Sequence, residues 1–236
     1  MKTRPMGVLL LLCCIYAIRC NAAENRLMTN LEAGKKQHVV AYGTSLTAGG
    51  AWVKQVEQVL NERYPELVKL TNSGSPGKYS NWGVQNLQRR VIDLKPDAVF
   101  IEFAMNDSVA KFNCPLEKAK TNLETMITRI RTDLPDCVII LQVMNPVIGT
   151  KGPAGHRPHL GDYYQMYRDV AAARKLVLVD HAPAWKVVLD QGENAFHKLV
   201  PDSLHPNAEG CKQIVTPGIL KALSGEIAGE IAAKPL

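Results

Sequence analysis

The chain has 236 residues, of which 46% are hydrophobic and 21% charged, and its formal net charge is +6. Without the three basic residues of the first 22 positions, 25 basic residues stand against 22 acidic ones, and no cluster of Lys or Arg remains that would indicate a nucleic-acid groove. The three cysteines beyond position 22 are too few for a disulfide scaffold. The length of this part, roughly 210 residues, suits a single α/β domain.

Residues 1–22 have the pattern of a secretory signal peptide. Lys2 and Arg4 precede the apolar run 7–18, which is short for a membrane span, and small residues follow it. The pattern therefore predicts that the protein is exported, to the periplasm or the medium, and is not stably inserted in a membrane after cleavage.

Two alternatives to a cleaved signal stay open beside the expected cleavage after Ala22 or Ala23. The apolar run is also compatible with an uncleaved signal anchor. Cys20 at the end of this run would suit a bacterial lipoprotein signal, although Arg19 before it fits the expected small residue poorly.

After a segment at 23–35 that we expect to be a linker, apolar β-branched runs alternate with helical patterns. Strands are predicted over residues 36–42, 67–71, 98–103, 137–144 and 176–180. Helices are predicted over residues 52–64, 84–94, 115–132, 163–171 and 206–223. Such alternation is typical of a parallel sheet with helices on both faces, so we predict a flavodoxin-like, doubly wound, three-layer α/β/α fold with five parallel strands. This domain spans residues 36–224, and a tail follows over 225–236.

Polar or glycine residues follow the first three predicted strands: Ser45, Gly74 and Asn106. The carboxyl ends of parallel strands share one edge of the sheet, where ligands of this fold class bind. Asp202 and His205 stand three residues apart before the last helix, on a loop that can reach the same edge. The spacing lets the carboxylate hold one imidazole nitrogen while the other faces the serine, the arrangement of an activated nucleophile.

These residues lie in four short motifs, which are Gly-Thr-Ser-Leu at 43–46, Asn-Ser-Gly-Ser-Pro-Gly at 72–77, Ala-Met-Asn-Asp at 104–107 and Asp-Ser-Leu-His-Pro at 202–206. In this order they resemble the SGNH (GDSL-type) hydrolase superfamily, which carries serine, glycine, asparagine and histidine at its signature positions. The resemblance covers about residues 36–223. It implies an SGNH hydrolase fold and an ester-hydrolysing, lipase-like or esterase activity without a metal or cofactor.

The resemblance also implies a role for each motif residue. Ser45 would be the nucleophile, His205 the general base and Asp202 the group that orients His205. The backbone N–H groups of Ser45 and Gly74, with the side-chain amide of Asn106, would form the oxyanion hole. Such donors are needed because a tetrahedral intermediate places negative charge on the former carbonyl oxygen.

Two positions depart from the family pattern. Thr44 replaces the aspartate that usually precedes the serine, and Ala104 replaces the first glycine of the third motif. Neither change removes a reacting group, so we expect both to affect the shape of the pocket. We predict that Thr44, His156 and His159 contact the substrate.

Five polar residues near these motifs remain to be interpreted. His156, Arg157 and His159 follow the fourth predicted strand, where they suit a substrate contact, a lid or a solvated loop; the two histidines lack further ligands for a zinc site. Glu102 lies in an otherwise apolar strand, so it needs a hydrogen-bonding partner or a place at the strand end. We interpret Asp107 as a structural partner of the loop backbone.

The residues and the resemblance together favour an exported serine esterase that works through an acyl-Ser45 intermediate on a carbohydrate O-acetyl or other short-chain ester. Its expected partner is a small-molecule or glycan ester, and no nucleic acid. Lysophospholipase, thioesterase and acyltransferase activities at the same site are the alternatives. A non-catalytic glycan- or peptide-binding protein on the same fold is the alternative from another class.

Overall fold

The computed structural model describes residues 26–224. The signal peptide predicted over 1–22 and the tail over 225–236 lie outside the described residues. Within the segment expected to be a linker, residues Arg26–Glu32 form the helix α1. The reason is that Leu27, Met28 and Leu31 fall on one face of a helical turn and are buried, so this segment packs on the domain core.

The predicted five-stranded parallel sheet is confirmed. Its strands are β1 (Gln37–Gly43), β2 (Val68–Asn72), β3 (Ala98–Glu102), β4 (Val138–Val143) and β5 (Val177–Asp180), in the order β2-β1-β3-β4-β5. All four neighbouring pairs are parallel. Every residue of β3 and of β4 is buried, as expected of near-continuous apolar strands covered on both faces.

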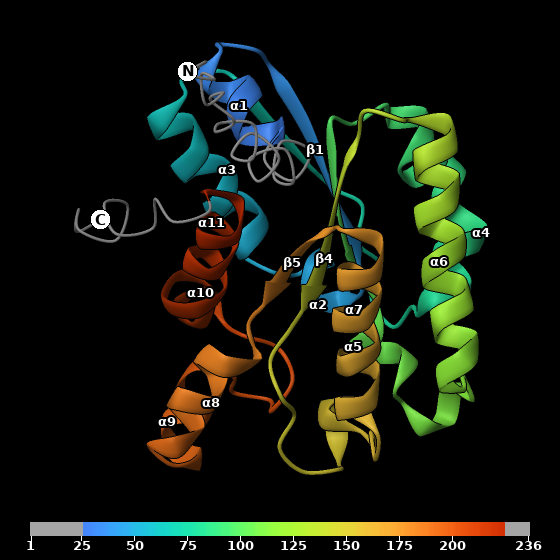
Figure 1. Cartoon of the computed structure of the whole chain (residues 1–236). Coiled ribbons are helices and arrows are strands. Elements are labelled where there is room, and N and C mark those ends of the chain that lie inside the picture. Colours follow the sequence, from blue (N-terminus) through green and yellow to red (C-terminus); the bar gives the residue numbers. More distant parts are fainter. Residues whose placement is uncertain (1–25, 225–236) are drawn as a thin grey trace, which may run out of the picture.

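Helices cover both faces of the sheet, which gives the three layers predicted from the sequence (Figure 1). One face carries α1, α3 (Trp52–Arg63) and α11 (Thr216–Ser224). The other face carries α4 (Ser80–Arg90), α6 (Leu116–Asp133) and α7 (Leu160–Arg174). Each helix turns one apolar stripe inward; in α6 the buried residues are Ala119, Asn122, Leu123, Met126, Ile127 and Ile130.

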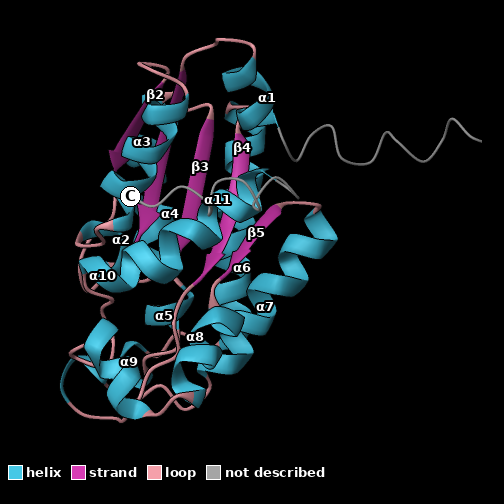
Figure 2. Cartoon of the chain, turned by 90° about the vertical axis from the view of Figure 1, so that its left-hand side faces the viewer, coloured by secondary structure: helices cyan, strands magenta, loops and turns pink. Residues whose placement is uncertain are grey.

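Several short elements that the apolar periodicity does not predict gather beyond the carboxyl ends of the strands (Figure 2). They are α2 (Ser45–Ala48), α5 (Ala104–Asp107), α8 (Ala182–Asp190) and α9 (Glu193–Leu199). Single-turn 3₁₀ segments lie at Ala110–Phe112 and Gly152–Ala154. A third, Ile92–Leu94, follows α4 on the way to β3, so the helix predicted over 84–94 begins earlier, at Ser80, and its last residues form this separate 3₁₀ turn. Helices of one or two turns show too few apolar repeats to stand out in a sequence.

The last predicted helix, over 206–223, is divided into three helical segments. They are α10 (Ala208–Gly210), the π-helical segment Cys211–Val215 and α11. Asn207 begins the first of them, because its side chain accepts the backbone N–H of Gly210. No helix within residues 26–224 is long and apolar enough to cross a membrane.

The strand order reverses between β1 and β3. The connection after β1 leads to β2 on one side, whereas the chain after β3 continues to β4 on the other side. In open α/β sheets this switch point leaves a crevice beside the carboxyl ends of the two strands. The turns after β1 and β3 carry Ser45 and Asn106, so the fold places both motifs at this crevice.

Candidate active site

Ser45 is the first residue of α2 and follows β1 after a single turn residue. Thr44 is the N-cap, and its hydroxyl accepts the N–H of Leu46 at 3.2 Å. The N–H of Ser45, at the first helical position, has no partner within the helix. The turn thus presents the hydroxyl and the backbone N–H of one residue at the crevice.

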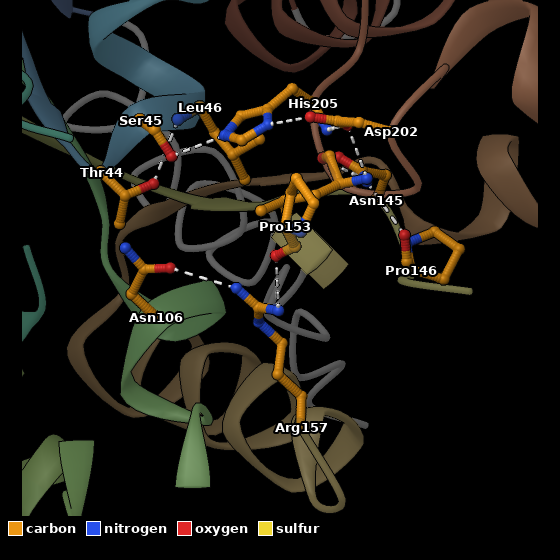
Figure 3. A network of polar contacts seen from close by, with 11 residues as sticks. Thr44, Ser45, Leu46, Asn106, Asn145, Pro146, Pro153, Arg157, Asp202 and His205 are labelled. Atoms are coloured by element: carbon orange, nitrogen blue, oxygen red, sulfur yellow. Dashed lines mark hydrogen bonds and ion pairs between the residues drawn. The ribbon is translucent and has the colours of Figure 1, made fainter. Parts of the chain in front are cut away.

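Asp202 and His205 form the hydrogen-bonded pair that their spacing predicts. Asp202 Oδ1 accepts the backbone N–H groups of Leu204 at 3.0 Å and of His205 at 2.7 Å, while its Oδ2 lies 2.6 Å from His205 Nδ1. His205 Nε2 lies 2.8 Å from Ser45 Oγ, so Asp202, His205 and Ser45 form a continuous hydrogen-bonded series (Figure 3). Ser203, at the centre of this tight turn, has a positive φ of 65°.

The pKa of the Asp202 carboxyl is lowered from its ordinary value. Burial of the group acts in the opposite direction, but the hydrogen bonds from His205 and from the Leu204 N–H favour the charged form and prevail. Asp202 therefore stays ionised and accepts the Nδ1–H of His205. This tautomer leaves Nε2 free to take the proton of the Ser45 hydroxyl.

Asn145 supports this turn from the end of β4. Its Nδ2 donates to Leu204 O at 3.0 Å and to Pro146 O at 2.9 Å, and Asn145 O accepts the Tyr164 hydroxyl at 2.8 Å. Asn145 is not among the site residues predicted from the sequence. The signal was available, because Asn145 is a polar residue at the carboxyl end of a predicted strand, the same rule that identified Asn106.

Gly74 lies against α2 because the chain after β2 continues beside β1. The Ser75 N–H donates to Gly43 O at 2.9 Å, and a Cβ on Gly74 would stand 2.5 Å from Ala48 N, so only glycine fits. The N–H of Gly74 donates to Asn72 Oδ1 at 3.0 Å. An oxyanion at this position would therefore share the Gly74 N–H with Asn72.

Asn106 is buried in α5 on the other side of the crevice. Its Nδ2 donates to Lys78 O at 2.8 Å, and its Oδ1 accepts from Arg157 Nη2 at 3.4 Å (Figure 3). An amide nitrogen carries two hydrogens, so one remains for a ligand. Because a guanidinium can only donate, Arg157 also fixes which way the amide of Asn106 is turned.

Glu102 ends β3 directly opposite Gly43 of β1. Its Oε2 accepts the Thr44 N–H at 3.1 Å, the Thr44 hydroxyl at 2.7 Å and the Thr47 hydroxyl at 3.4 Å. Burial raises the pKa of Glu102 to about 8. Glu102 thus has both properties expected of it, a hydrogen-bonding partner and a place at the strand end.

Thr44 does not have the position predicted for it. The residue is fully buried, and its side chain is engaged with Glu102 and Leu46 beneath the turn. The expectation that Thr44 contacts the substrate is therefore corrected: the threonine hydroxyl points into the protein because the carboxyl of Glu102 lies there. Asp107 is a structural partner as predicted, since its Oδ1 accepts the Ser80 N–H at 2.8 Å.

Serine, histidine and aspartate in hydrogen-bonded order, with N–H donors beside the serine, are what acyl transfer requires. The sequence profile of the GDSL-like lipase/acylhydrolase family matches residues 41–213. This range includes the five motif residues, Ser45, Gly74, Asn106, Asp202 and His205. The chain belongs to the GDSL-like lipase/acylhydrolase family. It is accordingly a serine hydrolase that acts on ester bonds, as the resemblance implied.

Solved structures of similar fold support the architecture of this GDSL-like hydrolase. The acetylxylan esterase Axe2 from Geobacillus stearothermophilus superposes with a TM-score of 0.69 at 22% identity, over 80% of this chain and 95% of Axe2. The α/β hydrolase LAE5 from the metagenome of Lake Arreo, Spain, gives a TM-score of 0.69 at 23% identity, over 81% and 97% of the two chains. At these identities the likeness shows the fold alone. A comparison with curated protein sequences finds no match.

The two histidines predicted to contact the substrate lie in the loop after β4 of the GDSL-like hydrolase. His156 is exposed and lines a cavity together with Arg157. His159 is also exposed, and its Nδ1 lies 3.4 Å from Asp162 Oδ2. The structure brings neither of them into hydrogen-bonding contact with Ser45, Asp202 or His205. Within residues 26–224, no three His, Cys, Asp or Glu side chains are grouped to hold a metal ion.

Proposed function

We propose that this hydrolase cleaves a carboxylic ester through an acyl-Ser45 intermediate. The observation that carries the proposal is the distance of 2.8 Å between Ser45 Oγ and His205 Nε2, with Asp202 on the other imidazole nitrogen. His205 takes the hydroxyl proton as Ser45 attacks the ester carbonyl, and then donates it to the leaving alcohol. Water, activated by the same histidine, releases the acid and restores Ser45.

The tetrahedral intermediate needs donors where its oxygen becomes negative. The N–H of Ser45 and the remaining Nδ2 hydrogen of Asn106 are available, and the N–H of Gly74 is shared with Asn72. Losing one such donor typically costs about 2.7–4 kcal/mol of barrier. These three groups are therefore proposed as the oxyanion hole, with Ser45 serving as both nucleophile and donor.

A carbohydrate O-acetyl or other short-chain ester is the proposed substrate. The similarity of fold to an acetylxylan esterase supports a glycan ester. Lysophospholipase, thioesterase or acyltransferase action at the same site remains the alternative within this class.

The experiment that tests this function is hydrolysis of p-nitrophenyl acetate, butyrate and octanoate by the purified protein beside Ser45→Ala. We expect turnover to be lost in the variant and to be highest for the acetate or butyrate ester. Highest turnover of the octanoate would support a lipase-like activity instead. Equal rates in both proteins would contradict the role of Ser45 and favour a non-catalytic binding protein.

We also propose that the protein is exported, to the periplasm or the medium, by the signal at residues 1–22. The support is the charged, apolar and small-residue order of that segment. N-terminal sequencing of the protein recovered from each cell fraction tests this. A mature chain that begins at Ala23 or Glu24, after cleavage at Ala22 or Ala23, supports the proposal, whereas a chain retaining Met1 in the membrane fraction would identify a signal anchor.

A further inference from the structure

Arg157 extends from the loop after β4 to the edge of the candidate active site. Its Nε donates to Met105 O at 3.0 Å, its Nη1 to Pro153 O at 3.3 Å and its Nη2 to Asn106 Oδ1 at 3.4 Å. Figure 3 shows the guanidinium directed toward Asn106, on the side of the site where Ser45 and His205 lie. The side chain is partly buried.

No ion pair within residues 26–224 involves Arg157. All three of its hydrogen-bond acceptors are neutral oxygens. A guanidinium has five N–H donors, so two remain for a ligand. Burial lowers the pKa of Arg157, which reflects the cost of placing a cation here. Glu102 is close enough to interact, but its own pKa of about 8 leaves it largely protonated at neutral pH. A partly buried cation is ordinarily paired, so Arg157 lacks an anion.

Arg157 also lines a cavity of about 490 Å³. Most of the wall is apolar, and its apolar side chains are Pro146, Val147, Pro158, Leu160, Ala182 and Leu189. No acidic residue lines the cavity. Leu160 and Gly161, which also line it, are the first two residues of α7.

The other ionisable groups near this cavity are already paired or exposed. Lys186, on the wall, lies 2.7 Å from Asp190 Oδ1 and is mostly exposed. Asp162, in the first turn of α7, lies beside His159 and is not among the residues that line the cavity. His156, also in the wall, is exposed. Among the described residues, Arg157 is therefore the permanently charged cation in the wall that has no carboxylate partner.

Arg157 connects this cavity with the proposed oxyanion hole, although Ser45, Asn106 and His205 do not themselves line the cavity. Arg157 is in direct contact with Asn106 through the Nη2 hydrogen bond. Pro146, another residue of the wall, follows Asn145, whose amide donates to the carbonyl of Leu204, the residue before His205. Arg157 thus lies both at the edge of the active site and in the wall of the cavity, so a group bound by Arg157 would lie beside a substrate whose ester is at Ser45.

We propose that Arg157 binds a carboxylate of the substrate, so that this hydrolase acts on esters that carry an acidic group. The inference rests on the proposed esterase function and names the chemistry of its substrate. A guanidinium with two free N–H groups matches a carboxylate well, and the apolar wall accommodates the carbon skeleton beside it. The carboxylate belongs either to the acyl part, as in a hemiester of a dicarboxylic acid, or to the alcohol part, as in an O-acetylated uronic acid.

The experiment compares kcat/KM for two matched pairs of substrates. The acyl pair is mono-p-nitrophenyl glutarate and its neutral methyl ester; the alcohol pair is an O-acetylated galacturonic acid and its neutral methyl ester, followed by acetate release. We expect the intact protein to prefer the charged member of one pair by about tenfold or more, the size of a charged hydrogen bond. The pair that shows the preference identifies which part of the substrate carries the carboxylate.

Arg157→Gln should reduce this preference to about one, mainly by raising KM for the charged member, while Arg157→Lys should retain part of it. Lys186→Gln is the matched control, because it removes an exposed and already paired cation from the same cavity; it should change the preference less than about threefold. A purely structural role of Arg157 would lower both members of a pair equally, and an unchanged ratio in Arg157→Gln would overturn the proposal.

The failure of this inference differs from the failure of the esterase function. Ser45-dependent hydrolysis of p-nitrophenyl acetate, with no preference for a charged member in either pair, would overturn only the role of Arg157. Rates on p-nitrophenyl acetate that are the same in Ser45→Ala would overturn the esterase function, and the inference with it.

Discussion

Thr44 donates both its backbone N–H and its hydroxyl to a single oxygen of Glu102, at 3.1 and 2.7 Å. The residue before the nucleophile is thus held by a buried carboxyl of the neighbouring strand. In the family pattern an aspartate usually precedes the serine. In this chain the acidic group beside the turn is instead Glu102, at the end of the neighbouring strand β3. A carboxyl at both positions would bring two buried acids together, so the threonine suits the presence of Glu102.

The first prediction concerns this exchange. Thr44→Asp should lower the free energy of unfolding by about 2 kcal/mol or more, because it removes the donor to Glu102 and adds a second buried acid. It should also lower kcat, since the Ser45 turn is displaced. Thr44→Ser retains both donors and serves as the control. Adding Glu102→Gln to Thr44→Asp should recover part of the stability, measured by thermal unfolding; no recovery would contradict the coupling of the two positions.

The second prediction is a dependence of stability on pH. Burial raises the pKa of Glu102 from 4.5 to about 8, so between these values the folded protein holds a proton that the unfolded chain has released. Since the folded state then binds more protons, the stability due to this group falls as pH rises through that window. Glu102→Gln removes the titration. The Tm of Glu102→Gln minus the Tm of the parent protein should therefore increase from about pH 5 to 8. A constant difference would contradict the raised pKa.

The third prediction separates the two roles of Asp202. Asp202→Asn keeps the Oδ1 acceptor for the backbone N–H groups of Leu204 and His205, but its amide would donate to His205 Nδ1 and impose the wrong tautomer. We expect kcat to fall about 10³–10⁴-fold with little change in Tm. Asp202→Ala should lose the turn as well, and with it about 1 kcal/mol of stability. Near-normal turnover in Asp202→Asn would exclude Asp202 as the orienting acid.

The fourth prediction tests the donor role of Asn106. Asn106→Asp retains an acceptor for Arg157 but loses the Nδ2 hydrogens. Both Asn106→Asp and Asn106→Ala should therefore reduce kcat about 10²–10³-fold with a smaller effect on KM, as expected of a group that stabilises the transition state. Steady-state kinetics on p-nitrophenyl acetate measures this. Full activity of the aspartate variant would contradict the role of Asn106 as a donor in the oxyanion hole.

The elements that could be predicted are those whose signal is local. The five strands and the helices α3, α6 and α7 bury a continuous run or a regular stripe of apolar residues. Such patterns can be recognised in the sequence without knowledge of the tertiary contacts. The segment 23–35 is predicted to be a linker, although seven of its residues form α1, because they carry only a short apolar repeat. Likewise α8 and α9 follow from packing at the end of the sheet rather than from their own periodicity.

The sequence by itself determined the parallel sheet, the four motifs and the edge of the sheet where they meet, because strand alternation and turn residues depend on neighbours along the chain. Only the tertiary structure decided what each polar side chain faces. Thr44 turns inward to Glu102, which is 58 residues away, and Arg157 reaches Asn106 over a separation of 51 residues. Such contacts depend on the register of packed elements and on the direction of each side chain, which no local pattern of residues specifies.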